Sequence, residues 1–126
     1  MKKSKIAGIG FNVPDNVVTN HDLEDMMDTT DEWIKTRSGI EERRWVEAGT
    51  ANSDLALPAC TEAIQKAGIT PNEIDAIIVG TVSSYYNFPG MAPIIQQKLG
   101  ITHHVPAYDI SAACSAFIYL LEIGDQ

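Results

Sequence analysis

The chain has 126 residues, about the length of one domain. Its hydrophobic fraction of 44% is enough for a packed core, and its net charge of −8 argues against a nucleic-acid surface, which needs clustered lysine and arginine. No apolar run approaches the roughly 18 residues of a membrane-spanning helix, so no membrane partner is expected.

Strands and helices are predicted to alternate along the chain. The runs KIAGIG and DAIIVGTVS are short and apolar, as buried strands are, and the helices have capping residues and glycine stops. In chain order, we expect a strand over 5–10, helices over 19–27, 29–37 and 52–67, a strand over 75–83, a helix over 91–99, a strand over 106–111 and a helix over 114–123. This order predicts an α/β layered fold with a mainly parallel sheet.

Local signals set the predicted helix ends. The expected N-caps are Thr19 or Asn20 for the first helix and Thr29 or Thr30 for the second. The third helix is expected to start at Asn52 or Ser53, and the expected stops are Gly39 and Gly68. The last predicted helix is unusual because only Ser115, Tyr119 and Glu122 interrupt its apolar surface. A helix that is apolar on most sides is buried on most sides. Either more chain or a partner subunit is therefore expected to cover it.

Cys114 is the first candidate for chemistry. It falls at the first turn of the last predicted helix, where unpaired N–H groups and the positive end of the helix dipole stabilise a thiolate. The same N–H groups can hold the oxyanion of a thioester under attack. The alternative is a buried structural cysteine, which is the interpretation we favour for Cys60, among alanines in the middle of a helix.

Trp33 and Arg37 form a second candidate site. They are four residues apart and so share one face of a helix. An indole face can stack on adenine, and a guanidinium can bind phosphate oxygens. The alternative is a surface tryptophan packed on the stem of an arginine.

The two cysteines also bear on the compartment. They are far apart, with no disulfide framework and no metal-binding spacing, so we expect no metal site. The apolar run after the N-terminal lysines is too short for a signal peptide. These features predict a cytoplasmic protein without a nucleic-acid partner.

Several motifs together resemble one family, the 3-oxoacyl-[acyl-carrier-protein] synthase III enzymes. DISAACSAF (109–117) is similar to the active-site signature of that family. TNHDLEDMMDTTDEWIKTRSGIEERR (19–44), IDAIIVGTVS (74–83), FPG (88–90) and IQQKLGI (95–101) match its other blocks in order. The resemblance implies a thiolase-like fold with α/β/α/β/α layers, of which residues 1–126 would be the truncated N-terminal domain, with the C-terminal half absent.

The resemblance also implies an activity. The family begins type II fatty-acid synthesis: a cysteine takes an acyl group from acyl-CoA, and the acyl-enzyme condenses with malonyl-acyl carrier protein. Cys114 occupies the nucleophile position. The acyl-CoA and the carrier protein are substrates, so no cofactor is expected, and the enzyme is normally a homodimer. The family's catalytic His and Asn fall outside this sequence, so the chain alone is expected to be inactive.

Further residues take roles from the resemblance. Thr29, Trp33 and Arg37 match positions that contact coenzyme A, and Phe88 matches a dimer-interface position that lines the partner's acyl pocket, with ordinary core as its alternative role. Ala116 stands where the family usually has glycine.

Other residues near these motifs receive structural roles. We interpret Arg43 and Arg44 as solvated charge, and Asp109 as a tether of the strand end rather than an acid or base. His21, His103 and His104 are interpreted as surface or loop residues.

Two other classes of function remain open. One is another thiolase-fold acyltransferase, including a polyketide-type synthase. The other is a non-catalytic, truncated domain that only binds or assembles. The starter acyl group does not follow from these residues.

Overall fold

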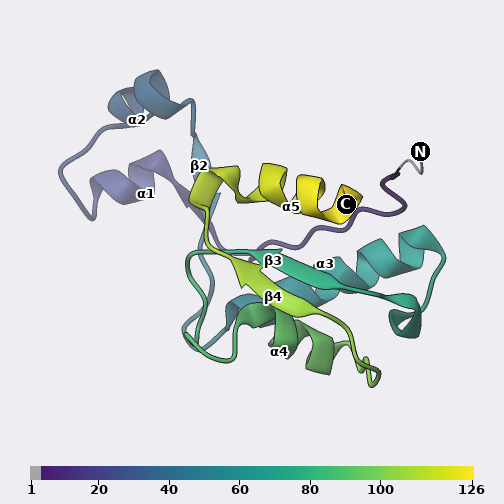
Figure 1. Ribbon diagram of the computed structural model, residues 1–126. Helices are drawn as coiled ribbons and strands as arrows, with labels where there is room; N and C mark the ends of the chain where they lie inside the picture. The colour runs from purple at the N-terminus through teal and green to yellow at the C-terminus, as the bar shows by residue number, and fades with distance from the viewer. Residues whose placement is uncertain (1–3) are drawn as a thin grey trace. The chain divides into compact units, whose positions relative to one another are not determined.

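The computed structural model describes residues 4–126. Its helices and strands alternate along the chain (Figure 1). They are β1 (Val17–Thr19), α1 (Asn20–Glu24), α2 (Asp31–Ser38), β2 (Glu42–Arg44), α3 (Asn52–Ala67), β3 (Ile77–Gly80), α4 (Met91–Lys98), β4 (Ala107–Ile110) and α5 (Ala116–Asp125), with short 3₁₀ turns at Pro71–Glu73 and Ala113–Ser115. The chain divides into two compact units, the smaller being Val13–Thr50 and the larger being the residues up to Asn12 together with Ala51–Gln126.

The larger unit is built on a parallel pair of strands. β3 and β4 run side by side from Ile77 opposite Ala107 to Gly80 opposite Ile110, and α4 connects them along the chain. Helix α5 lies on one side of the pair, and α3 and α4 lie on the other (Figure 1). The predicted parallel pairing is confirmed. Both strands are shorter than expected, and β3 is half-buried rather than enclosed on both faces.

The core of the larger unit follows from this layering. Its buried apolar side chains come mostly from one face of α4, from the segment after it and from the start of α5: Met91, Ala92, Ile95, Ile101 and Ala116. Helix α4 begins at Met91 as predicted and ends at Lys98, one residue earlier than predicted. Gly90 precedes it, and Gly100, in the left-handed region with a φ of 72°, follows its C-cap.

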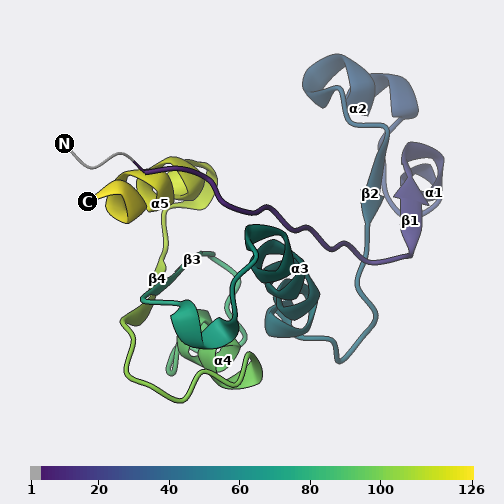
Figure 2. The same ribbon diagram turned by 90° about the vertical axis from the view of Figure 1, so that its right-hand side faces the viewer.

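The segment before residue 13 corrects one prediction. The expected strand over 5–10 forms no strand ladder among residues 4–126, although the segment runs beside α5 and then α3 (Figure 2). It follows the backbone of α3 so closely that a Cβ atom at Gly8 or Gly10 would lie about 2 Å from a carbonyl oxygen of that helix. The apolar run therefore marks close packing of the segment on a helix, with glycine needed for the approach.

The smaller unit contains an antiparallel pair that the sequence analysis did not predict. β1 and β2 pair with Val17 opposite Arg44 and Thr19 opposite Glu42. The β-branched run of β1 was a signal for a strand, but a three-residue strand is too short for a periodic pattern. The cap prediction at this junction holds, because Thr19 forms a capping box with Asp22 at the start of α1.

Helix α2 has the predicted cap and the predicted stop. Thr30 caps it by accepting a hydrogen bond from the Trp33 N–H, and Gly39 ends it with a φ of 71°. Helix α1 is shorter than predicted and ends at Glu24 rather than Met27. Helix α3 starts at Asn52 and is followed by Gly68, both as predicted, and the N–H of Ala51 before it donates to the Asp54 carboxylate.

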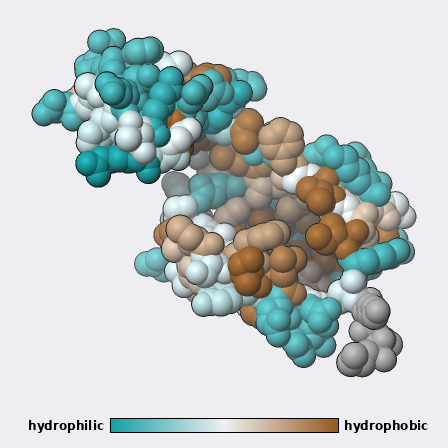
Figure 3. Space-filling model, turned by 90° about the horizontal axis from the view of Figure 1, so that it is seen from above, coloured by the Kyte–Doolittle hydropathy of each residue, from teal (hydrophilic) through white to brown (hydrophobic). Residues whose placement is uncertain are grey.

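Helix α5 exposes the apolar side chains that the sequence analysis singled out. Phe117 and Ile118 are more than three-fifths exposed, at 63% and 62%. Apolar residues gather on this face of the larger unit (Figure 3). What covers the helix stays a prediction. Within the described part of the chain, no helix combines the length and the hydropathy needed to cross a bilayer.

Candidate functional site

Cys114 lies at the turn that joins β4 to α5. It is exposed, in the middle of the 3₁₀ turn Ala113–Ser115, directly before the helix rather than inside its first turn. The residue before it, Ala113, has a φ of 45°, in the left-handed region that a side chain disfavours by roughly 1 kcal/mol or more. The neighbouring N–H of Ser115 bonds to the Ala112 carbonyl. The backbone thus presents the thiol at a strained strand-to-helix junction.

The alanine at 116 is accommodated by a glycine on the neighbouring strand. Ala116 is 5% exposed, and a Cβ built on Gly80 of β3 would lie 2.8 Å from the Ala116 Cβ. Two such carbons in contact are normally more than 3.4 Å apart. Gly80 therefore leaves the space that the methyl group of Ala116 fills, directly behind the Cys114 turn.

This contact gives a paired prediction. Gly80→Ala should destabilise the protein by about 1–3 kcal/mol, because it overpacks the α5–β3 contact. Adding Ala116→Gly should recover much of that loss, measured as urea-unfolding midpoints. Gly124→Ala is the matched control, because a Cβ there meets nothing within 4 Å. A double variant that is no more stable than Gly80→Ala would contradict this packing.

Asp109 holds the segment that carries Phe88. Its Oδ2 accepts from the Met91 N–H at 2.6 Å, and its Oδ1 accepts from the Ala92 N–H at 2.7 Å. Ser84 Oγ also donates to Asp109 Oδ2, at 3.3 Å. One carboxylate at the end of β4 thus caps the start of α4, where Gly90 provides no side-chain cap. These contacts agree with the tethering role expected for Asp109.

Phe88 is an exposed side chain in the same region. It is 91% exposed and therefore has no core role within this chain. It borders a hollow of about 450 Å³ whose lining also includes Tyr86, Tyr108, Asp109 and Ser111. Its predicted role at a dimer interface stays a prediction.

The second cysteine differs from Cys114. Cys60, on α3, is half-buried, and burial raises the pKa of its thiol. It is therefore less ionised at neutral pH than an ordinary thiol, which agrees with the structural role expected for it. The three histidines are exposed, as predicted; His21 pairs with Glu24 at 3.0 Å, which raises its pKa.

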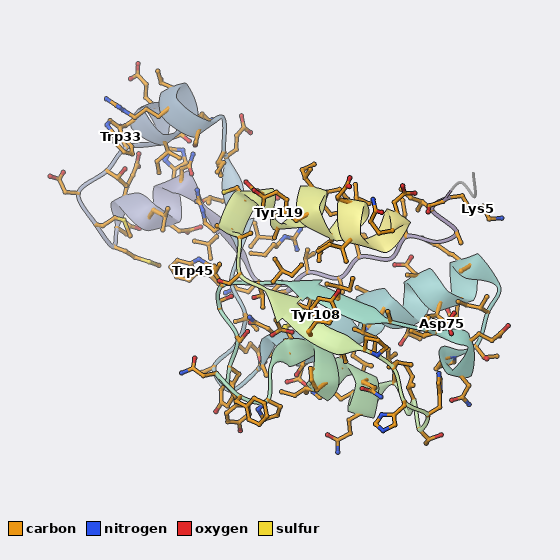
Figure 4. The ribbon with its side chains drawn as sticks, viewed as in Figure 1. Lys5, Trp33, Trp45, Asp75, Tyr108 and Tyr119 are labelled. Atoms are coloured by element: carbon orange, nitrogen blue, oxygen red, sulfur yellow. The ribbon has the colours of Figure 1, made fainter. Side chains whose placement is uncertain are left out.

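The smaller unit contains Thr29, Trp33 and Arg37, the three residues for which the family resemblance implies contacts with coenzyme A. The Arg37 guanidinium carbon lies 5.0 Å from the centre of the Trp33 ring, as the four-residue spacing predicted. Thr29 and Trp33 line one hollow of about 220 Å³, and Trp33 and Arg37 line another of about 340 Å³. Trp33 is 56% exposed on α2 (Figure 4), so its ring is accessible to a ligand.

The sequence analysis considered Asn20 only as a possible helix cap and missed the role that the structure gives it. It is 1% exposed, and all the hydrogen-bonding groups of its side chain are used. Its Nδ2 donates to Asp31 Oδ1 at 2.9 Å and to the Ile40 carbonyl at 2.8 Å, and its Oδ1 accepts from Arg43 Nη2 at 2.6 Å. The only sequence signal was its position beside a helix cap, where asparagine is ordinary.

The interpretation of Arg43 as solvated charge is wrong. Arg43 is half-buried, and its second guanidinium nitrogen donates to the Val18 carbonyl at 3.1 Å. The reason is the pairing of β2 with β1, which places Arg43 opposite Val18 and brings its guanidinium within reach of Asn20. Arg44 is exposed but also bonded, to the carbonyls of Pro14 and Asp15.

Comparisons with known proteins agree on one family. The family model described as thiolase, N-terminal domain, matches residues 35–118. The beta-ketoacyl-[acyl-carrier-protein] synthase III of Symbiobacterium thermophilum is 49% identical, with 96% of this chain and 36% of that protein covered. The crystal structure of 3-oxoacyl-[acyl-carrier-protein] synthase III from Aquifex aeolicus is 47% identical with a TM-score of 0.90, covering 96% of this chain and 39% of that one.

A solved structure from another pathway is also similar. The priming beta-ketosynthase of the R1128 polyketide biosynthetic pathway is 32% identical with a TM-score of 0.91, covering 98% of this chain and 37% of that one. The chain thus spans less than half the length of these relatives. The predicted thiolase-like fold is confirmed, and so is the resemblance to the synthase III enzymes.

Proposed function

The chain belongs to the thiolase family, in its N-terminal domain, and from that premise we propose that it carries the nucleophile of a 3-oxoacyl-[acyl-carrier-protein] synthase III. The Cys114 thiolate attacks the thioester carbonyl of an acyl-CoA. The bond between that carbonyl and the sulfur of CoA breaks, CoA leaves as a thiolate that takes up a proton, and the acyl group stays on Cys114 as a thioester.

The second half of the reaction uses this acyl-enzyme. Malonyl-acyl carrier protein loses carbon dioxide, and the resulting carbanion attacks the thioester carbonyl on Cys114. The carbon–sulfur bond to Cys114 breaks, which frees the thiolate and releases 3-oxoacyl-carrier protein. We assign no residue of this chain to the decarboxylation step.

One observation carries the proposal. Cys114 is exposed at the strained turn after a parallel strand, within a DISAACSAF motif that resembles the active-site signature of the family. Helix α5 begins two residues after it, so the positive end of the helix dipole lies close to the thiol, where negative charge develops when a thioester is attacked.

The remaining roles belong to the same proposal. Thr29, Trp33 and Arg37 bind coenzyme A, with the indole as a stacking surface and the guanidinium on a phosphate. Phe88 contributes to the contact of a homodimer. The cytoplasm is the working compartment, since a catalytic thiol stays reduced there.

The priming of a polyketide is the second candidate function. The similarity to a priming ketosynthase favours it, and the acylation of Cys114 would be the same step. The two candidates differ in the carrier protein that supplies the malonyl group. Condensation with a polyketide carrier protein, in preference to the fatty-acid carrier protein, would favour the second.

Acylation of Cys114 tests the proposed function. Incubating the natural protein with acyl-CoA should add the mass of one acyl group to the peptide that contains Cys114. Trp33→Ala should raise the acyl-CoA concentration needed for half-maximal labelling about tenfold, since losing a stacking surface costs about 1–2 kcal/mol. Trp45→Phe is the matched control on the second tryptophan. An acyl group on another residue would refute the assignment of Cys114, and an unchanged requirement would remove Trp33 from the site.

A further inference from the structure

We infer that Asn20 is the positioning residue of the Trp33–Arg37 pair, because its one side-chain amide holds both ends of the helix that carries them. The inference rests on the proposed function in one respect, namely that this pair binds coenzyme A. The side chain of Asn20 bonds to Asp31, Ile40 and Arg43 rather than to Trp33 or Arg37, so it acts on the pair through the helix.

The two ends of α2 are held by the same nitrogen. Asn20 Nδ2 donates to the side chain of Asp31, the first residue of α2, and to the carbonyl of Ile40, which follows the Gly39 cap. Hydrogen bonds from Asn20 and from Lys35 lower the pKa of Asp31, so its carboxylate is charged at neutral pH and makes a strong acceptor. The N–H of Asp31 donates in turn to Glu24 Oε1 at 2.6 Å.

The third bond connects the helix to the strands. Arg43, on β2, donates to Asn20 Oδ1 and to the Val18 carbonyl on β1. α2 is thereby tied to the β1–β2 pair through Asn20 rather than through apolar packing. Val18 is the one buried apolar side chain among Val13–Thr50, and no residue of α2 is buried. A helix without an apolar core under it depends on such polar bonds for its orientation.

Asparagine is the side chain that this position requires. It supplies two donors and an acceptor from one planar group, and all three are used. Aspartate has nearly the same shape and keeps the acceptor for Arg43. It has no donor and would place a carboxylate about 3 Å from that of Asp31, where the Asn20 Nδ2 now lies 2.9 Å away.

The test is a swap of the two side chains in the natural protein. Asn20→Asp should speed hydrogen exchange of the α2 amides and weaken the binding of coenzyme A, measured by titration calorimetry, about tenfold in Kd, which corresponds to about 1.4 kcal/mol. Adding Asp31→Asn restores a donor between positions 20 and 31 with its direction reversed. The double variant should therefore recover most of the α2 protection and most of the affinity.

Two controls separate positioning from general damage. Asn72→Asp adds the same charge at an exposed asparagine of the larger unit and should change neither quantity. The rate at which iodoacetamide alkylates Cys60, which is half-buried in the larger unit, should be equal in all four proteins, because unfolding of this unit would expose the thiol.

The outcomes distinguish the inference from the proposed function. Unchanged α2 exchange in Asn20→Asp would overturn the inference, and so would a double variant as weak as the single one. If the natural protein bound no coenzyme A, the proposed function would fail instead. Faster α2 exchange in Asn20→Asp, reversed by Asp31→Asn, would then still support Asn20 as the residue that positions this helix.

Discussion

Iodoacetamide in limiting amount at neutral pH is expected to alkylate Cys114 before Cys60, by about tenfold or more in rate. Cys114 is exposed, whereas Cys60 is half-buried and burial raises the pKa of its thiol. Because a raised pKa keeps Cys60 protonated to a higher pH, less of the reactive thiolate is present at neutral pH. Peptide mass mapping of the labelled protein gives the order directly.

Two serine variants extend this prediction to the reaction. Cys114→Ser should remove the fast phase of alkylation and reduce acyl transfer by at least about 10³-fold, because a serine hydroxyl is hardly ionised at neutral pH and has no adjacent base assigned to it here. Cys60→Ser should keep the rate of the fast alkylation phase and the rate of acyl transfer within about twofold of the natural protein. Faster labelling of Cys60, or full acyl transfer in Cys114→Ser, would exclude Cys114 as the nucleophile.

The sequence predicts the elements whose signals are local. Thr30 and Gly39 bound α2 because a hydroxyl can cap a helix start and glycine can take a left-handed φ, and both effects act within a few residues. The spacing of Trp33 and Arg37 predicts their contact for the same reason.

Contacts between distant residues were harder to predict. The apolar run at 5–10 has the composition of a buried strand, and only its packing on α3 reveals why its glycines are needed. Asn20 meets Asp31, Ile40 and Arg43 at separations of 11, 20 and 23 residues. No periodicity encodes such a set, because it arises only when β1 and β2 pair.

The candidate site likewise has some features that the sequence predicts and others that depend on the tertiary structure. Cys114 could be predicted from its place between a strand and an apolar helix, together with a motif that covers nine residues. The left-handed φ of its neighbour Ala113 could not be predicted, because alanine has no preference for that conformation. The role of Gly80 in making room for Ala116 likewise depends on how α5 crosses β3.

Asp109→Ala is the second substitution for which we expect a large effect. It should lower the free energy of unfolding by about 2–4 kcal/mol, because the N–H groups of Met91 and Ala92 lose a charged acceptor at buried positions. Asp109→Asn should lose about half as much, since an amide keeps one of the two acceptor oxygens. Urea-unfolding midpoints measure both, provided that the slope m is unchanged.

Ser84→Ala is the matched control, because it removes only the 3.3 Å bond to the same carboxylate and should change stability by less than about 1 kcal/mol.

Asp109→Ala also tests which contacts hold the segment that carries Phe88. The segment from Ser84 to Ala92 is fixed to β4 through Asp109, so hydrogen exchange over this segment should become faster in Asp109→Ala, while α2 in the smaller unit keeps its protection. Equal stability of Asp109→Ala and the natural protein would mean that packing alone positions the segment next to the strand that leads to Cys114.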